Sequence, residues 1–393
     1  MKKLILILFC FTLINVKALD IESKNAILYN MNENKIIYSK NENEITKIAS
    51  LTKIMTCLIA IENTKNLSEV VIMTKDMFKG LDEQNAYQVG LKVGDIVTKE
   101  DLLYTSFIAS GADATMGLVL SITNSEEEYL KLMNEKATSI GLKNTVFKNT
   151  IGLDKEGQTS TVKEVAETLK YALKNETFKK IFETNSYTLS NNKITVYSSL
   201  KSTASKFGIS VPYIIGGKTG YTKEAGRCLA SVAVDTTNNI KYLLVTTNAS
   251  TTPQHVTDAE TIYNYYFENY KYHKVLLKDT EILNLKVKNS KIKEIKIKAS
   301  QDYESYLDNS FDIKDIELVY KGKEEVDYKT KKGDNLGTLS IIYKDKNLKD
   351  IKITMPESVN FSIISFIFDN NIRKVIFISL IVIILIIMGI KKR

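Results

Sequence analysis

The fold of this 393-residue chain is decided by the stretch Ile214-Ile215-Gly216-Gly217-Lys218-Thr219-Gly220-Tyr221. Two apolar residues followed by two glycines predict a strand that arrives at a crowded edge, where a side chain would block whatever lies alongside. Lys218 then provides a fixed cation and Thr219 a hydroxyl group. Both groups suit an anion held against the strand, so the stretch predicts a binding edge.

A candidate nucleophile lies upstream, in Ser50-Leu51-Thr52-Lys53. The polar segment 41–46 precedes it, and apolar residues then recur at helical spacing: Ile48, Leu51, Ile54, Met55, Leu58 and Ile59. Ser50 is therefore expected in the first turn of a helix, where backbone N–H groups and the positive end of the dipole favour an oxyanion. Lys53 follows one turn later on the same face, within reach of the serine hydroxyl.

The spacing Ser-x-x-Lys is common by itself. It also occurs at Ser160/Lys163, Ser190/Lys193, Ser198/Lys201 and Ser290/Lys293, whereas Lys-Thr-Gly occurs once. Taken alone, Ser50 is better explained as a helix cap followed by a solvated lysine. A third element, Ser110-Gly111-Ala112, lies between the other two. The order Ser-x-x-Lys, Ser-x-x, Lys-Thr-Gly is the signature that penicillin-binding proteins share with class A β-lactamases.

Residues from about 20 to 270 resemble the low-molecular-mass penicillin-binding proteins that are serine-type D-alanyl-D-alanine carboxypeptidases, peptidase family S11. The resemblance extends beyond the three motifs, to 91–95, 141–145, 152–154 and 222–229. Residues 333–339 resemble the small β domain that many members carry. The resemblance implies an α+β fold, in which a β-lactamase/transpeptidase-like catalytic domain has helices packed on an antiparallel sheet plus a helical subdomain. A small β-rich domain and a C-terminal transmembrane helix would follow.

The resemblance also implies the chemistry. Ser50 would attack the carbonyl between the last two D-alanines of a peptidoglycan stem peptide, giving an acyl-enzyme and free D-alanine. Lys53 would be the base, and Ser110 would relay a proton toward the leaving amine. A lysine has an ordinary pKa of about 10.4, so burial and the like charge of Lys218 are expected to lower the pKa of Lys53.

The third motif would bind the substrate. The resemblance assigns the terminal carboxylate to Lys218 and Thr219, and it makes Gly220 and Tyr221 part of the same substrate-binding strand. The backbone N–H groups of Ser50 and Tyr221 would be the oxyanion donors. Penicillins would acylate the same serine, so β-lactams are the expected inhibitors.

One position departs from the family pattern. The middle motif is usually Ser-x-Asn, and Ala112 stands at its third position. This departure leaves a catalytically impaired, wall-binding pseudoenzyme as an alternative, with Asp113 as a group that could compensate. A serine β-lactamase is a further alternative, although the Glu-x-x-Leu-Asn element of that family is absent. Ser190-Asn191-Asn192 also reads Ser-x-Asn, but its surroundings predict the turn of a β-hairpin.

The N-terminal residues indicate export. Lys2 and Lys3, an apolar run from 4 to 14, and small residues near Ala18 predict a secretory signal peptide over residues 1–18. The mature chain then keeps Cys57 and Cys228, both expected in the core and not in a disulfide. Two histidines and two cysteines at unrelated spacings predict no metal site, and no cofactor is expected.

The C-terminal residues indicate a membrane anchor. Residues 375–390 carry no charge and lie between basic residues, which predicts a single span that leaves the catalytic domain outside the cell membrane. A buried C-terminal core helix is the alternative. The net charge of +8 comes from scattered lysines, so no nucleic-acid binding is expected.

We expect four segments: the signal peptide 1–18, the catalytic domain 19–273, the β-rich domain 274–357 and the transmembrane anchor 375–390. Within the catalytic domain, Thr98 is expected to open a helix with a capping box. The remaining predictions are strands at 26–30, 35–40, 229–234 and 242–247 and helices at 125–140 and 161–173.

Overall fold

The computed structural model describes residues 19–191 and 193–391, which form two compact units that meet between Glu268 and Asn269. The predicted signal peptide lies outside the described residues. The predicted domain boundary, after residue 273, falls within strand β10 (Tyr270–Leu276). This strand pairs with β13 (Tyr303–Asp308), so β10 belongs to the second unit.

The first unit is built on a five-stranded antiparallel sheet in the order β2-β1-β9-β8-β7. Its strands are β1 (Asn25–Asn30), β2 (Lys35–Lys40), β7 (Ile214–Thr222), β8 (Gly226–Asp235) and β9 (Ile240–Ala249). The four strands that the sequence predicts here are confirmed. The long connection from β2 to β7 leaves the Lys-Thr-Gly strand at the open edge of the sheet.

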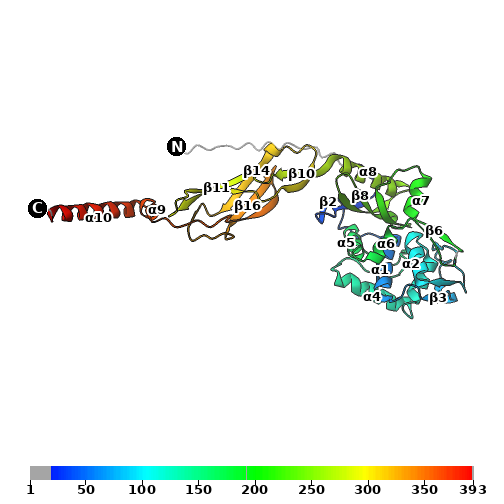
Figure 1. The fold of residues 1–393 in the computed structure, drawn as a ribbon. Helices are drawn as coiled ribbons and strands as arrows, with labels where there is room; N and C mark the ends of the chain where they lie inside the picture. The colour runs from blue at the N-terminus through cyan, green and yellow to red at the C-terminus, as the bar shows by residue number, and fades with distance from the viewer. Residues whose placement is uncertain (1–18, 192, 392–393) are drawn as a thin grey trace, which may run out of the picture. The chain divides into compact units, whose positions relative to one another are not determined.

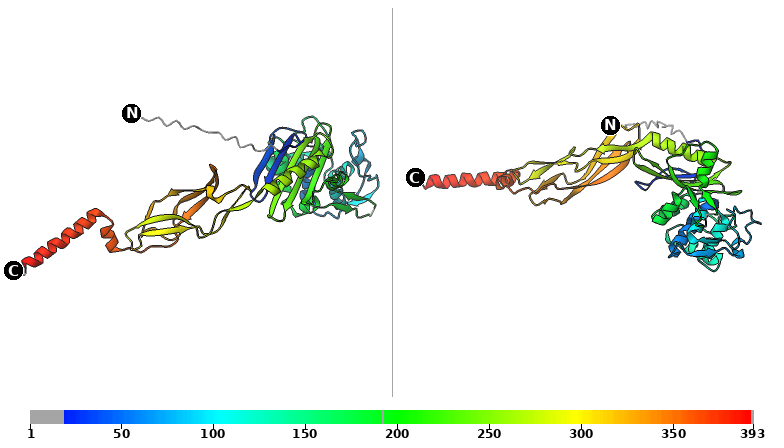
Figure 2. Two further views of the ribbon diagram at one scale, coloured as in Figure 1. Left: turned by 90° about the horizontal axis from the view of Figure 1, so that it is seen from above. Right: turned by 45° about the vertical axis from the view of Figure 1, so that its right-hand side comes forward.

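Helix α8 (Gln254–Asn269) lies across one face of this sheet, as the left view of Figure 2 shows. It is joined to the sheet by the hydroxyls of Tyr263 and Ser231, 3.0 Å apart. Helix α5 (Val162–Ala172) packs on the other face, against β1 and β9 (Figure 1). The sheet is therefore covered on both faces and leaves its β7 edge for the site.

The segment between β2 and β7 supplies most of the helices. They are η1 (Ala49–Thr52), α1 (Lys53–Asn63), η2 (Lys75–Phe78), α2 (Lys99–Ile108), α3 (Ala112–Leu120), α4 (Glu126–Ser139), α5, α6 (Glu176–Phe182) and α7 (Ser199–Lys206). The predicted capping box is confirmed, since Thr98 and Asp101 each accept a hydrogen bond from the other's N–H. Ser125 and Thr161 cap the two other predicted helices. Helix α1 is the central one, with every residue from Lys53 to Ala60 buried.

Two short antiparallel pairs complete the first unit: β3 (Val70–Ile72) with β4 (Ile96–Thr98), and β5 (Ser186–Thr188) with β6 (Thr195–Tyr197). Ser190 and Asn191 lie in the connection between β5 and β6, so the hairpin reading of this segment is confirmed in its described residues. The Ser190 hydroxyl donates to the carboxylate of Asp101, at 2.6 Å. It is not part of the cleft described below.

The glycines of β7 make close packing possible, as predicted. A Cβ atom on Gly216 would lie 2.4 Å from the ring and carbonyl of Phe182, and one on Gly217 would lie 2.7 Å from Leu200. Such distances leave no room for a side chain. The strand can therefore lie against both α6 and α7 only because these positions have no Cβ.

The second unit is rich in β structure. Besides β10 and β13 it contains β11 (Glu281–Lys288), β12 (Glu294–Lys298), β14 (Ile316–Gly322), β15 (Glu325–Asp327), β16 (Asn335–Tyr343), β17 (Lys346–Thr354) and the short turn η3 (Ile313–Asp315). Inward-facing residues alternate with lysines and glutamates along β11 and β12, as the sequence predicts. They form an apolar core with Leu339, Ile341 and Ile353.

The chain continues through α9 (Ile363–Phe368) into α10 (Asn371–Ile390). Helix α10 has 20 residues, a mean hydropathy of 2.6 and none of its apolar window buried within the described chain. At 1.5 Å per residue it is about 30 Å long, the thickness of the hydrocarbon layer of a bilayer. By length and composition α10 could cross a membrane, and it is not the buried core helix that the sequence left as an alternative.

Candidate active site

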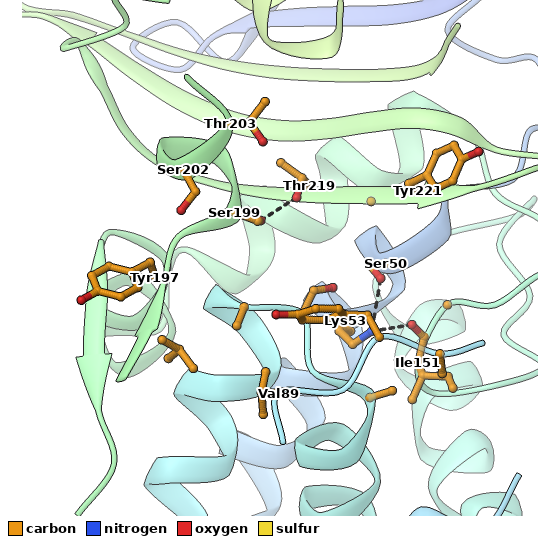
Figure 3. A pocket seen from close by; sticks show the side chains of 18 of the residues that line it. Ser50, Lys53, Val89, Ile151, Tyr197, Ser199, Ser202, Thr203, Thr219 and Tyr221 are labelled. Atoms are coloured by element: carbon orange, nitrogen blue, oxygen red, sulfur yellow. Dashed lines mark hydrogen bonds between the residues drawn. The ribbon is translucent and has the colours of Figure 1, made fainter. Parts of the chain in front are cut away.

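A cleft of about 680 Å³ lies where the β7 edge faces the helices. It is walled by β7, the N-terminus of α7, the β5–β6 hairpin and the segments 85–89 and 151–153. The three sequence motifs meet here, because the lining includes Ser50, Lys53, Ser110, Thr219, Gly220 and Tyr221 (Figure 3). Residues that are more than 160 positions apart in the chain thus share one cavity.

Ser50 lies in the 3-10 turn η1, one turn ahead of the point where α1 begins at Lys53. The sequence placed this serine within the first turn of the α-helix itself. Ala49, just before it, has a φ of 45°, which an L-residue adopts only when its surroundings hold it there. The tight turn brings the Lys53 Nζ to 3.2 Å from the Ser50 Oγ.

The Lys53 amine is enclosed by protein. Its side chain is 2% exposed, and its Nζ donates to the carbonyl oxygen of Ile151 at 2.6 Å. Burial lowers the pKa of Lys53 to about 8. The expected contribution of Lys218 to this shift is not among its causes, since burial alone lowers the pKa and the nearby Asp113 opposes it.

Lys218 is also fully buried, and it does not line the cleft. Its Nζ donates to the Ser110 Oγ at 2.9 Å and to the Thr219 carbonyl oxygen at 2.8 Å. Burial, reinforced by the positive charge of Lys53, holds its pKa well below the ordinary range. Ser110 itself has a φ of 67°, the left-handed conformation that points its hydroxyl toward this amine. The direct carboxylate contact that the sequence assigned to Lys218 stays a prediction.

The groups that remain for an anion lie along the β7 edge. The Thr219 and Ser199 hydroxyls are 2.6 Å apart, and both line the cleft. Arg227 also lines it, with its guanidinium 3.9 Å from the centre of the Tyr221 ring. His255 is buried in the same wall, and burial lowers its pKa to about 4, so the imidazole is neutral at pH 7.

Two glycines let the nucleophile turn sit against its neighbours. A Cβ atom on Gly220 would lie 2.8 Å from the backbone nitrogen of Ser50. One on Gly152, whose φ is +85°, would lie 2.2 Å from the Ala49 carbonyl oxygen. The turn is thus pressed between β7 and the 151–153 segment, with its backbone N–H beside the substrate-binding strand.

Ala112 begins α3 and packs with Leu81 and Ile151 in a small apolar cluster at the wall of the cleft. The neighbouring Asp113 does not compensate for the missing asparagine, because its carboxylate accepts the N–H groups of residues 89, 90 and 91. Asp113 therefore fixes the loop that carries Val89 and does not reach the substrate space. The second partner of Lys53 is the Ile151 carbonyl.

Sequence reasoning missed four contributors: the Ile151 carbonyl, Ser199, Arg227 and His255. A backbone carbonyl has no sequence signal. Ser199 lies inside the Ser198/Lys201 pair, which had to be discounted as common, and Arg227 stands nine residues after Lys218, within the stretch on which the family resemblance rests. Strands β7 and β8 form a hairpin in which Arg227 pairs with Tyr221. A predicted register for these two strands could therefore have placed Arg227 beside the third motif.

Cys57 and Cys228 are free thiols, and both are buried, which confirms their placement in the core. Burial raises the pKa of Cys57 to about 11 and that of Cys228 to about 12, so both stay protonated at pH 7. Among the described residues, no three His, Cys, Asp or Glu side chains gather in a way that could hold a metal ion.

Comparison with known proteins places this geometry in a family. Residues 13–251 match the family described as D-alanyl-D-alanine carboxypeptidase. The chain belongs to this D-alanyl-D-alanine carboxypeptidase family. Residues 270–360 match the C-terminal domain of penicillin-binding protein 5, so the predicted family and two-part fold are confirmed.

Individual relatives agree with the family match. The carboxypeptidase DacF of Bacillus subtilis is 32% identical over 328 residues, which cover 82% of both chains. The D-alanyl-D-alanine carboxypeptidase of Streptomyces sp. strain K15 is 31% identical, over 56% of this chain and 78% of the relative. Penicillin-binding protein 5 from Haemophilus influenzae has the same fold, with a TM-score of 0.64 at 22% identity over 87% of this chain and 98% of the other.

Replacement of Ala112 by asparagine tests whether the cleft has adapted to alanine. We expect Ala112→Asn to lower the rate of acylation by a fluorescent penicillin, by about tenfold, because a larger polar side chain would displace Ile151, whose carbonyl holds Lys53. Ala112→Ser is the small control and should stay closer to the parent. A faster Ala112→Asn variant would show that the missing amide limits this enzyme.

The pH dependence of acylation tests the state of Lys53. With neutral Lys53 as the predicted base, the acylation rate should rise with pH to a midpoint near 8, where the amine of Lys53 loses its proton. Below that midpoint the neutral fraction, and with it the rate, should fall about tenfold per pH unit. Stopped-flow measurement with a penicillin from pH 5 to 10 checks this. A midpoint near 10.4, the value for an exposed lysine, would contradict it.

Proposed function

We propose that this chain removes the C-terminal D-alanine from peptidoglycan stem peptides through an acyl-enzyme on Ser50. The family acts on peptidoglycan D-Ala-D-Ala and binds β-lactams. The observation that carries the proposal is the 3.2 Å contact between the Ser50 Oγ and a buried Lys53 amine whose pKa is lowered to about 8. Such an amine is partly neutral at physiological pH and can act as a base.

In the acylation step, the neutral Lys53 amine takes the proton of the Ser50 hydroxyl while the Oγ attacks the carbonyl carbon of the penultimate D-alanine. The electron pair of the C=O bond moves to the oxygen, beside the backbone N–H groups of Ser50 and Tyr221. A neutral amine has one lone pair and two N–H bonds. It can therefore accept from Ser50 while it still donates to Ile151.

The tetrahedral intermediate then collapses and its C–N bond breaks. The leaving D-alanine nitrogen needs a proton, and Ser110 passes to it the proton that Lys53 took from Ser50, which leaves Lys53 neutral again. Lys218 donates to the Ser110 Oγ at 2.9 Å and holds the hydroxyl of this relay in place. Water next attacks the ester carbonyl, with Lys53 again as the base, and the bond to the Ser50 Oγ breaks as that oxygen takes its proton back, which releases the shortened stem peptide.

The terminal carboxylate is assigned to Thr219, Ser199 and Arg227. The two hydroxyls form a pair at the β7 edge, and Arg227 is the cation that lines this part of the cleft among the described residues. Arginine recognises carboxylates through two N–H groups at once. Lys218 is buried beside this site and donates to the Ser110 hydroxyl and the Thr219 carbonyl.

The alternatives from the sequence have less support. The pseudoenzyme reading rested on Ala112, but the partner that an asparagine would give Lys53 is supplied by the Ile151 carbonyl. The β-lactamase reading lacks its deacylation motif, the Glu-x-x-Leu-Asn element. The carboxypeptidase reading agrees with the family and with the described site.

The localisation and domain limits remain part of the proposal. We assign residues 1–18 to a signal peptide. We move the boundary predicted after residue 273 to the point between Glu268 and Asn269, so that 19–268 form the catalytic domain and 269–357 the β-rich domain. Helix α10, with Arg373 and Lys374 near its start and Lys391 after its end, would span the cell membrane and leave the catalytic domain outside. The apolar side chains of α9 are largely exposed and suit the interface.

Mass spectrometry of the penicillin adduct tests the nucleophile. The label should map to the peptide that contains Ser50, Ser50→Ala should abolish it, and the parent enzyme should release D-alanine from a diacylated Lys-D-Ala-D-Ala peptide. Ser190→Ala is the matched control, since Ser190 also has a lysine three residues on but lies outside the cleft. A label on another serine, or a label that hydrolyses within seconds as in a β-lactamase, would overturn the assignment.

Truncation tests the anchor. A chain that ends at Asn370 lacks α10 but keeps the contact of Phe361 with Ser290, so it should fold. We expect alkaline carbonate to release it from membranes while the full chain stays bound. Its carboxypeptidase activity should equal that of the full chain. Retention after the alkaline wash would place the anchor elsewhere.

A further inference from the structure

The carbonyl that holds Lys53 lies in a segment without helix or strand. Residues 149–153 form no regular element, yet the Ile151 oxygen is fixed 2.6 Å from the Lys53 Nζ. Lys53, on α1, would lose its alignment if the peptide unit of Ile151 could rotate. The bonds made by the residues on either side of Ile151 therefore matter for the reaction.

Thr150, just before Ile151, is fully buried and held from two helices. Its backbone N–H and its hydroxyl both donate to one carboxylate oxygen of Glu126, each at 2.8 Å. Its carbonyl oxygen accepts from the hydroxyl of Thr56 on α1, also at 2.8 Å. Thr56 lies one turn after Lys53, so α1 bonds two consecutive carbonyls of this segment.

The residues after Ile151 are held by Asn149. The side-chain oxygen of Asn149 accepts from the N–H groups of Gly152 and Leu153, at 2.6 and 3.0 Å. Gln158 in turn accepts from the side-chain and backbone nitrogens of Asn149, each at 3.1 Å. Ile151 thus lies between two neighbours whose backbone groups are hydrogen-bonded. These bonds fix the direction of the Ile151 carbonyl.

From these contacts we infer that Glu126 is a positioning residue for the base. It touches neither Lys53 nor the cleft, and it acts through Thr150 on the direction of the Ile151 carbonyl. The inference rests on the proposed role of Lys53. The first turn of α4 suits this task, since the positive end of the helix dipole favours a carboxylate there. Glu126 and Thr150 together replace the support that the motif asparagine would give to the lysine.

Loss of the carboxylate should loosen the segment. Glu126→Ala would leave the buried N–H and hydroxyl of Thr150 without their acceptor, and such groups find partners by moving. A displacement of about 1 Å at a catalytic group typically costs about 100-fold in rate. Glu126→Gln keeps an oxygen that can accept both bonds, so it should retain the alignment.

The experiment compares Glu126→Ala, Glu126→Gln and Glu127→Ala in the full chain. Glu127 is an exposed carboxylate in the same helical turn and controls for the loss of charge beside the helix dipole. The readouts are the rate constant and amplitude of acylation by a fluorescent penicillin from pH 5 to 10, with thermal unfolding of each variant. We expect Glu126→Ala to lower the high-pH plateau rate constant by about 10- to 100-fold, and the other two to stay within about threefold of the parent.

The plateau separates positioning from other effects. At high pH Lys53 is neutral in every variant, so a shift in its pKa alone would leave the plateau unchanged. Partial unfolding would lower the amplitude and leave the rate constant of the folded fraction at the parent value. Either result, or a Glu126→Gln variant as slow as Glu126→Ala, would overturn the inference. A parent enzyme that penicillin does not label would instead refute the proposed function.

Discussion

The burial of the Lys53 amine is the constraint on which the rest of the site depends. An ammonium group removed from water loses its hydration, and the protein recovers this only by pairing it or by letting it become neutral. Here the amine is buried at the start of α1, and the Ile151 carbonyl is its acceptor at 2.6 Å. Burial lowers the pKa of Lys53 to about 8, so a part of the amine is neutral near pH 7, and the neutral form is what a serine needs beside it.

The site also depends on the close approach of three backbone segments. The nucleophile turn must lie against β7 on one side and against the 151–153 segment on the other, and a single Cβ at Gly220 or Gly152 would separate them. The need for this close approach also explains why β7 is an edge strand, with no strand paired to its outer side. Along β7 the residues alternate, so that Thr219 and Tyr221 face the cleft while Lys218 and Gly220 face the helices.

Much of the fold and of the candidate site could be predicted from the sequence, because the motifs combine helix or strand periodicity with residue types that have few other uses. The crowded edge at Gly216-Gly217, the capping box at Thr98 and the meeting of Ser50, Ser110 and Thr219 all follow from short patterns. Two features could not be read in this way. The side of β7 on which Lys218 lies depends on the strand register, and the Ile151 carbonyl belongs to the backbone, which has no residue-specific signal. The same holds for the partner of Lys53, since the Ile151 carbonyl reaches the amine through a tertiary contact that no motif predicts.

The two buried lysines also explain how a single proton can pass through the site. Burial lowers the pKa of each, and the positive charge of Lys53 further lowers that of Lys218. Like charges repel strongly in a low-dielectric interior, so a charge on Lys53 makes Lys218 less able to hold a proton. In the proposed reaction Lys53 takes the Ser50 proton during attack and passes it through Ser110 to the leaving amine. Lys218 donates to the Ser110 Oγ at 2.9 Å and so keeps the relaying hydroxyl in place. The proton that leaves Ser50 at the start of the step is thus the one that the leaving group receives at its end, and Lys53 is neutral again when water attacks.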